Sequence, residues 1–403
     1  GEPGVDINER NDICCPQLRA IDGVNPMDES FVYARSAGIT CVCTGPGSAN
    51  VLGGTFTAIK TAGTRIDDMI VKKEAAMKCA FGENPKRCYA SKCDSSRMTT
   101  AAILREALMK ARLYLQKKEA AGDDVFRQPA FDMKLEALIP VLRGQIPLKA
   151  HAHRADDIFT AIRIADEFGV RLTLEHTTEG HLIADELAKT GLCMAVGPSL
   201  NFATKVEVRN KSWKTPGILS RAGCHVSIIT DCTVIPQQYL PLCAGMAVKA
   251  GMDPFDALRA ITIHPAEHIG IADRVGSLEA GKDADLVITD GSPFEVSTTV
   301  RRLLRIKALL RRAQIANERK LYIGDVVLDY DSLTVTKGGV SQSLPQKEFY
   351  AERIVFRSGV SAVHPCDAGR SGLPRPHARH AGAAAPAPAG RARGPGQAAF
   401  RHV

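Results

Sequence analysis

Three segments, LKAHAHR (148–154), TLEHTTEGH (173–181) and VSIITDC (226–232), decide the fold expected of this chain. Each begins with apolar or β-branched residues typical of a buried strand and ends in histidine or aspartate. Two are followed by helical patterns, and the clearer one, over 155–168, ends at Gly169. Repeated strand and helix units predict a parallel sheet, and where such units close into a barrel the active site lies at the carboxyl ends of the strands. The polar strand ends are therefore expected to lie together.

His151, His176 and Asp231 are the candidate metal ligands, one from each segment. A metal bound by imidazole and carboxylate needs side chains from separate elements that converge on one point, and the ends of barrel strands supply this. A lone histidine is more often a hydrogen-bonded core residue, and Asp231 could be a turn carboxylate. Three such residues in corresponding positions favour a site for a divalent metal, with zinc expected first and iron or manganese as alternatives.

Two further histidines are candidate substrate contacts. Strand alternation places His153 on the same face as His151, where it could orient substrate or support a metal ligand. His181 falls on the first turn of a helix, as a helix-start residue or a substrate contact. A bound metal lowers the pKa of water towards ~7. Asp231 is then the expected catalytic base, which takes the proton from water and passes it to the leaving nitrogen.

The charge of the chain is concentrated at one end. The 403 residues carry a formal charge of +8, but residues 301–403 hold 18 Lys and Arg against 7 Asp and Glu, and residues 1–300 hold 34 against 37. The basic tail therefore argues only weakly for nucleic acid as a partner. The 12 cysteines form no CxxC pair, and we expect reduced thiols in a cytoplasmic protein. The sequence contains no long apolar run and no signal-peptide pattern, so we do not expect a membrane protein.

Other patterns predict the remaining elements. Strands are expected near 39–43, 75–81 and 192–196, and a long helix from Thr99 or Thr100 to about Lys118. Shorter helices are expected over 31–37, 215–222, 239–250 and 254–261, and a short strand over 286–288. The run RRLLRIKALLRR from Arg301 predicts a basic amphipathic helix, and LYIGDVVLDYDSLTV predicts two short strands around Tyr330 and Asp331.

Four runs resemble the amidohydrolase superfamily, in the branch of imidazolonepropionase-related proteins: KAHAHRADD, LEHTTEGHLIADELA, ITDCTVIPQQYLPL and ITIHPAEHIGIADRVGSLEAGKDADLVI. The resemblance covers about residues 1–300. It implies an α/β fold, a (β/α)8 TIM barrel with a divalent metal that hydrolyses a C–N bond of an amide, cyclic amide or peptide-like substrate, and a small β-sandwich beside the barrel. By that resemblance His151, His176 and Asp231 match the metal residues of the fifth, sixth and eighth strands.

The resemblance also implies a His-x-His pair on the first strand. The histidines of this chain begin at His151, so we expect a barrel that lacks its first strand, a remnant of the β-sandwich and impaired activity. Some members hold a second metal on a carboxylated lysine or a glutamate, for which Lys78 and Glu83 are the candidates here.

Residues 301–350 resemble the linker and first strands of the winged-helix output domain of two-component response regulators. The expected domains are a truncated barrel over 1–275, a β-sandwich remnant over 276–300, a partial winged-helix-like segment over 301–350 and a disordered, low-complexity tail over 351–403. We hypothesise that two unrelated genes are fused here.

The function expected is therefore that of a metal-dependent amidohydrolase with a small-molecule amide substrate. The alternatives are a DNA-binding regulator and a catalytically inactive barrel scaffold. Without a recognition helix, a basic tail predicts only nonspecific, salt-sensitive binding to nucleic acid. A homo-oligomer is compatible with the sequence.

Overall fold

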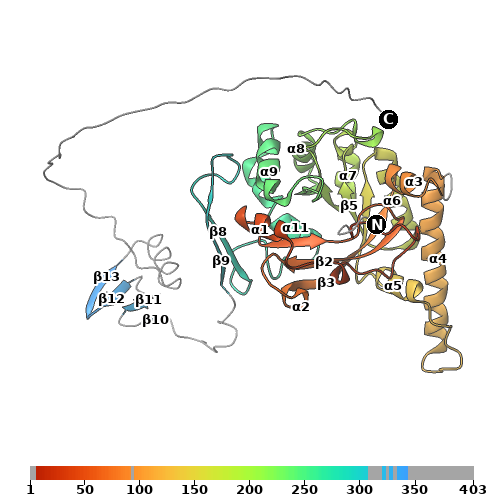
Figure 1. Cartoon of the computed structure of the whole chain (residues 1–403), viewed down its shortest axis with the longest axis horizontal. Helices are drawn as coiled ribbons and strands as arrows, with labels where there is room; N and C mark the ends of the chain where they lie inside the picture. The colour runs from red at the N-terminus through yellow and green to blue at the C-terminus, as the bar shows by residue number, and fades with distance from the viewer. Residues whose placement is uncertain (1–5, 92–94, 307–319, 324–325, 330–333, 344–403) are drawn as a thin grey trace, which may run out of the picture. The chain divides into compact units, whose positions relative to one another are not determined.

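The computed structural model describes residues 6–91, 95–306, 320–323, 326–329 and 334–343 (Figure 1). The chain divides into two compact units, residues 1–313 and 314–403, and each is described by itself. The first unit contains all the candidate site residues.

A curled seven-stranded sheet forms the centre of the first unit, and its strand order follows the chain (Figure 1). From β3 to β7 neighbouring strands run parallel, whereas β2 runs antiparallel to both β1 and β3. The strands are β1 (Cys41–Thr44), β2 (Leu52–Lys60), β3 (Ile70–Ala80), β4 (Leu148–Ala152), β5 (Leu172–His176), β6 (Cys193–Val196) and β7 (His225–Ile228). The predicted α/β class is confirmed, and the parallel part is the half-barrel that carries the three histidine and aspartate segments.

Strand β2 is an element of the central sheet that the sequence patterns missed. It contains two adjacent glycines, which weaken a strand pattern, and its pairing with β3 is irregular between Leu52 and Gly54. Gly54 has a φ of +108°, and a Cβ at this position would lie 2.3 Å from the carbonyl oxygen of Leu18. Only glycine fits this close backbone approach. The strand therefore needs a glycine at this position, and the same glycine weakens the strand pattern in the sequence.

Most helices lie where the apolar patterns predict them. The longest, α4 (Arg97–Ala121), begins earlier than expected because Ser96 is its N-cap and forms a capping box with Thr99. The others are α1 (Glu29–Ser36), α2 (Ile66–Met69), α3 (Glu83–Cys88), α5 (Met133–Leu142), α6 (Ala155–Phe168), α7 (Ala184–Thr190), α8 (Thr215–Arg221), α9 (Leu240–Lys249), α10 (Pro254–Arg259) and α11 (Ile263–His268), with short 3-10 turns at η1 (Ala20–Asp22), η2 (Gly180–Leu182), η3 (Val206–Val208) and η4 (Gln237–Tyr239).

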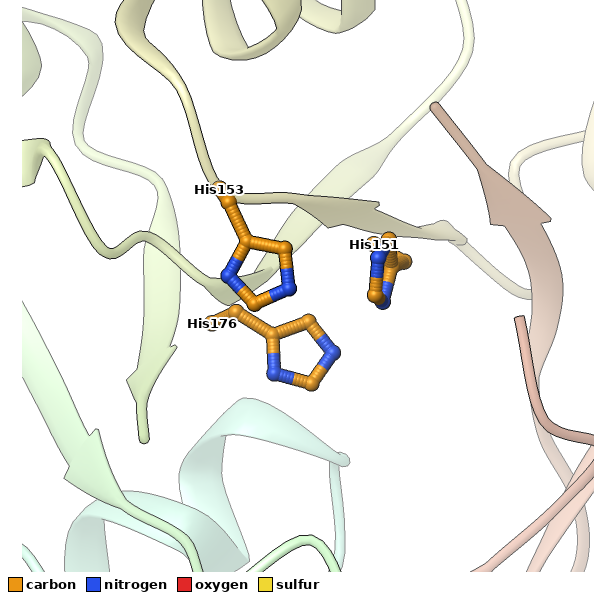
Figure 2. A group of neighbouring side chains, drawn as sticks. All are labelled: His151, His153 and His176. Atoms are coloured by element: carbon orange, nitrogen blue, oxygen red, sulfur yellow. The ribbon is translucent and has the colours of Figure 1, made fainter. Parts of the chain in front are cut away.

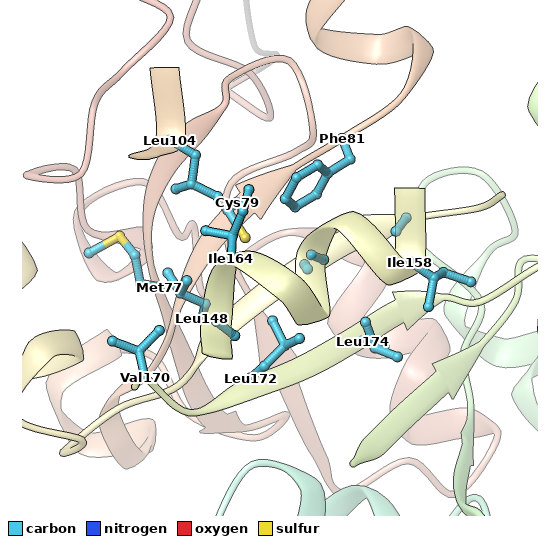
Figure 3. Packing of buried hydrophobic residues seen from close by; sticks show 14 of the residues in the cluster. Met77, Cys79, Phe81, Leu104, Leu148, Ile158, Ile164, Val170, Leu172 and Leu174 are labelled. Atoms are coloured by element: carbon cyan, nitrogen blue, oxygen red, sulfur yellow. The ribbon is translucent and has the colours of Figure 1, made fainter. Parts of the chain in front are cut away.

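The main hydrophobic core lies between the parallel strands and the helices α4, α5 and α6. Figure 3 shows Leu148 of β4 and Leu172 and Leu174 of β5 packed with Leu104 of α4 and Ile164 of α6. All five side chains are buried. Because strand side chains alternate between faces, the residues between these leucines point to the other face of the sheet. That face holds the candidate site.

Two strands beyond the large sheet form a hairpin, β8 (Ala284–Thr289) with β9 (Val300–Ile306). The strand predicted over 286–288 is present. The basic helix predicted from Arg301 is wrong for residues 301–306, which belong to β9, and residues 307–312 lie outside the described residues. Pairing with β8 satisfies the backbone of β9, so tertiary context overrides the helical pattern.

The described part of the second unit is a four-stranded antiparallel sheet in chain order, with β10 (Lys320–Ile323), β11 (Val326–Asp329), β12 (Thr334–Lys337) and β13 (Val340–Ser343). The sequence predicted two strands within 321–335, but three strands, β10, β11 and β12, have residues in this range. Tyr330 and Asp331, the predicted turn, lie outside the described residues, as does the predicted disordered tail over 351–403.

No helix in the described part of the chain combines the length and the apolar character needed to cross a membrane.

The core between α4 and the sheet can be tested on one helix. Replacing Leu108, which is fully buried, with alanine is expected to lower the free energy of unfolding by ~2–5 kcal/mol, because apolar contacts are lost and a cavity forms. Leu113 on the same helix is 52% exposed, and its replacement should change stability by less than about 0.5 kcal/mol. Urea unfolding of both variants measures the difference, and equal effects would contradict this packing.

Candidate metal centre

Three imidazoles meet at the carboxyl ends of two neighbouring strands. Figure 2 shows His151 and His153 from β4 and its end beside His176 from β5. The ring centroids are 4.7 Å apart for His151 and His153, 4.3 Å for His151 and His176, and 4.6 Å for His153 and His176. One ligand atom from each ring lies within 4.8 Å of the other two. All three side chains are buried.

Strand alternation places the β4 histidines. Leu148, Ala150 and Ala152 belong to the core on the helix side, so His151 and His153 face the other way. The sequence therefore puts both imidazoles on one face, as predicted from the HAH pattern.

His176 reaches the same place by a distortion of the backbone. Leu174 lies in the helix-side core, and simple alternation would send His176 to that side as well. His176 instead has a φ of +74°, and Thr177 after it has a φ of +42°. A left-handed conformation in a residue other than glycine costs roughly 1–3 kcal/mol and is typical of functional positions. The turn redirects the ring towards His151.

A backbone hydrogen bond fixes the tautomer of His176. Its Nδ1 lies 2.8 Å from the carbonyl oxygen of Gly197, which can only accept, so Nδ1 donates. The lone pair of the neutral ring is then on Nε2. This is the arrangement by which metal-binding histidines are usually oriented.

His151 carries the clearest signal for a ligand. Both of its ring nitrogens are buried and have no hydrogen-bond partner among the described residues. Burial, together with the nearby His176 and Lys78, lowers the pKa of His151 well below its usual value. A neutral imidazole without a partner is costly in the interior, and a metal ion would satisfy its lone pair.

His153 differs from His151 in having a partner. Its Nδ1 lies 2.7 Å from Oγ1 of Thr178. Burial, with the neighbouring His176 and His151, also lowers the pKa of His153 well below its usual value. It therefore offers a third neutral imidazole. Its ring lies directly beside those of His151 and His176, closer to them than expected of a residue that only contacts substrate.

Glu207 is a site residue that the sequence patterns missed. It lies on η3, fully buried, with Oε1 at 3.9 Å from Nε2 of His151 and 3.8 Å from Nε2 of His153. Lys205 lies 2.5 Å from the same oxygen. Burial raises the pKa of Glu207, but the Lys205 ammonium outweighs this and holds it below its usual range. No strand or helix pattern marks this loop, so its approach to the histidines could not be seen in the sequence.

The two residues considered for a second metal occupy different places. Oε1 of Glu83 accepts from the backbone N–H of Glu207 at 2.9 Å, and Oε2 of Glu207 accepts from that of Glu83 at 2.7 Å. Glu83 thus anchors the Glu207 loop. Lys78 is buried on β3, where its charge acts on both His151 and His176, and burial lowers the pKa of Lys78.

Asp231 follows β7 and is exposed, with a φ of +52°. Its charge acts on His176, although it is not part of the three-histidine group. It lines a cavity of about 2300 Å³ together with His176, Lys78 and Glu175. The structure therefore brings His151, His153 and His176 together, with Asp231 on the wall of the adjoining cavity.

His181 lies apart from this group, on η2, with its Nδ1 at 2.9 Å from Oγ1 of Thr215 on α8. Its hydrogen bond joins η2 to α8.

A buried ion pair lies beneath the histidines on the same face. Nζ of Lys149 is 2.7 Å from Oε1 of Glu175 and 3.0 Å from Nε2 of His268. Burial raises the pKa of Glu175, but the charges of Lys149 and Lys78 prevail and lower it to about 2. The pair joins β4 to β5, two residues before His151 and one residue before His176.

The fold and this site together indicate a class: α/β proteins in which side chains that could hold a metal meet at the carboxyl ends of parallel strands. A model of the amidohydrolase family matches residues 142–323. The crystal structure of an amidohydrolase from Thermotoga maritima is 41% identical and superimposes with a TM-score of 0.74, covering 76% of this chain and 80% of that one. The chain belongs to the amidohydrolase family.

Curated relatives match over smaller shares of their own length. Amidohydrolase tasK of Hapsidospora irregularis is 28% identical over 72% of this chain, but the match spans only 32% of that protein. An imidazolonepropionase of Geobacillus kaustophilus is 49% identical over 17% of this chain and 16% of its own length. The chain therefore spans about a third or less of these relatives.

A further similarity is to a regulator. The heme response regulator HssR of Staphylococcus epidermidis is 32% identical over 108 residues, which cover 25% of this chain and 46% of that protein. This is a partial match, and the winged-helix-like segment and the gene fusion stay predictions.

The three-histidine centre can be tested by metal binding. Replacing His151 and His176 together with alanine is expected to remove one equivalent of zinc, with an affinity loss at this centre of more than ~100-fold, because a lost ligand costs more than a lost supporting partner. Competition with a chromophoric chelator measures the affinity. His181→Ala is the matched control and should leave zinc binding unchanged; equal binding by the double variant and the control would exclude this centre.

Proposed function

We propose that this chain is a metal-dependent hydrolase that cleaves a C–N bond in a small amide, cyclic amide or peptide-like substrate. One observation carries the proposal: His151, neutral and with both ring nitrogens unpartnered among the described residues, lies against two further buried imidazoles beside a large cavity. Family membership supports a metal-dependent hydrolase. The names of the relatives, amidohydrolase and imidazolonepropionase, support a bond of this type.

The donor set fits a divalent ion with nitrogen ligands. His151 and His176 are proposed as ligands, and His153 as the third imidazole, in place of the substrate contact expected from the sequence. Neutral imidazoles suit zinc first, with iron and manganese as alternatives. A divalent ion held by these residues would lower the pKa of a bound water and polarise a carbonyl oxygen.

Asp231 is proposed as the group that moves the proton. Its carboxylate is exposed on the cavity wall and interacts with His176, so it can accept a proton from water and deliver it to the leaving nitrogen. Its left-handed backbone holds it in this place at the end of β7. His181, which bonds to Thr215, has no part in this mechanism.

We further propose that the activity of this chain is low. Residues 1–150 contain no histidine, whereas the family resemblance implies a His-x-His pair on a first strand. A cavity of about 2300 Å³ adjoins His176 and Asp231. The second candidate function is ligand binding by the barrel without catalysis. The lack of histidine in residues 1–150 favours it.

Turnover separates the two candidates. Zinc-loaded chain is expected to hydrolyse at least one member of a panel of N-acyl amino acids, dipeptides, lactams and imidazolonepropionate. Asp231→Asn should lower kcat/KM by ~10²–10⁴, because general acid–base catalysis is lost, while zinc content is unchanged. Asp123→Asn, at an exposed position, is the matched control. If the loaded chain turns over nothing on the panel, the binding role is favoured; if Asp231→Asn keeps full activity, the proposed proton transfer is wrong.

A further inference from the structure

A second group of possible ligands lies at the opposite end of the strands. His225 is the first residue of β7, whereas the candidate metal centre lies at the carboxyl ends. Helix α11 packs on β7 and contributes His264 and Glu267, three positions apart and therefore on one helix face. We propose that His225, His264 and Glu267 form a second divalent-metal site of the zinc class. This site does not depend on the proposed function.

The three side chains already lie at the spacing of a ligand set. One ligand atom from each lies within 4.8 Å of the others. The rings of His225 and His264 are 4.5 Å apart and tilted by 40°, and Nε2 of His225 lies 2.7 Å from Oε2 of Glu267. A divalent ion would take the place of the proton that His225 and Glu267 share. Two imidazoles and a carboxylate are a common zinc set, with a fourth position for water or another residue.

The strand backbone orients His264 for this role. Its Nδ1 donates to the carbonyl oxygen of Val226 at 2.9 Å, which leaves the lone pair of the neutral ring on Nε2. The residue is 8% exposed, so the ring is held in a fixed position between β7 and α11. This is the same kind of backbone support that His176 receives from Gly197.

A cysteine stands next to the group. Cys193, the first residue of β6, is the direct register partner of His225. Directly paired residues of neighbouring strands share a face of the sheet, so the thiol is a candidate for the fourth position. Thiolate sulfur is a strong zinc ligand.

An ion pair alone would explain less of the geometry. Holding α11 against β7 requires only His225 and Glu267, which are within hydrogen-bond distance of each other. It gives no role to the ring of His264, whose centroid lies 4.5 Å from that of His225. A metal ion uses all three side chains.

Zinc titration of the full chain tests the proposal, in a background in which His151 and His176 are alanine. That background separates the second site from the first, so either can fail without the other. It is expected to bind one equivalent of zinc, and His264→Ala should weaken binding by more than ~100-fold, because a ligand is lost. His181→Ala is the control. If the background variant binds no zinc, or if His264→Ala binds it equally well, the site does not exist.

A second, milder variant tests the site with less risk that the substitution itself unfolds the chain. Glu267→Gln keeps a hydrogen-bonding group opposite His225 at a side chain that is 43% exposed, so the metal-free melting curve should be unchanged. Zinc is expected to raise the melting temperature of the background chain, and to bind Glu267→Gln at least ~10-fold more weakly. If both chains respond to zinc alike, Glu267 is not a ligand and the proposal is overturned.

Discussion

The alternation of side chains along β4 is the constraint on which the rest of the structure depends. Leu148, Ala150 and Ala152 enter the core beneath α4 and α6, and this fixes Lys149 and His151 on the other face. A shift of one residue would exchange the faces, burying charge among leucines. The hydrophobic core therefore sets the register that places His151 and His153 on one face, towards which the backbone turn at His176 brings the third imidazole. The same burial keeps them neutral, and a neutral imidazole is the form that binds a metal.

The site also contains features that cost stability. Non-glycine residues with positive φ end β5 and follow β7, and buried charges lie at Lys149 and Glu175. Two of these features are compensated locally: Gly197 holds the ring of His176, and the two charges pair with each other. Strain and buried charge that are retained in this way, and concentrated at the strand ends, fit a functional site better than a purely structural one.

Elements that depend on neighbours in the sequence could be predicted, whereas elements that depend on contacts with distant residues could not. The strand ends at His151 and His176 and the helix α6 follow from local periodicity, and the structure has them. The strand β2 was hidden by glycines that a distant backbone contact with Leu18 requires.

Two other misses share this cause. The basic run from Arg301 has a helical pattern, yet β8 recruits its first residues as a strand. Glu207 reaches the histidines from a loop whose path is set by Glu83 and Lys205, and no local pattern records such contacts. Tertiary partners, rather than local propensity, decided each of these cases.

Anomalous scattering at the zinc absorption edge, from crystals of the zinc-loaded chain, tests the central claim most directly. The account predicts a peak at ~2.0–2.1 Å from ring nitrogens of His151, His153 and His176, at the carboxyl ends of β4 and β5. Absence of a peak among these three rings, in crystals that contain zinc, would contradict it.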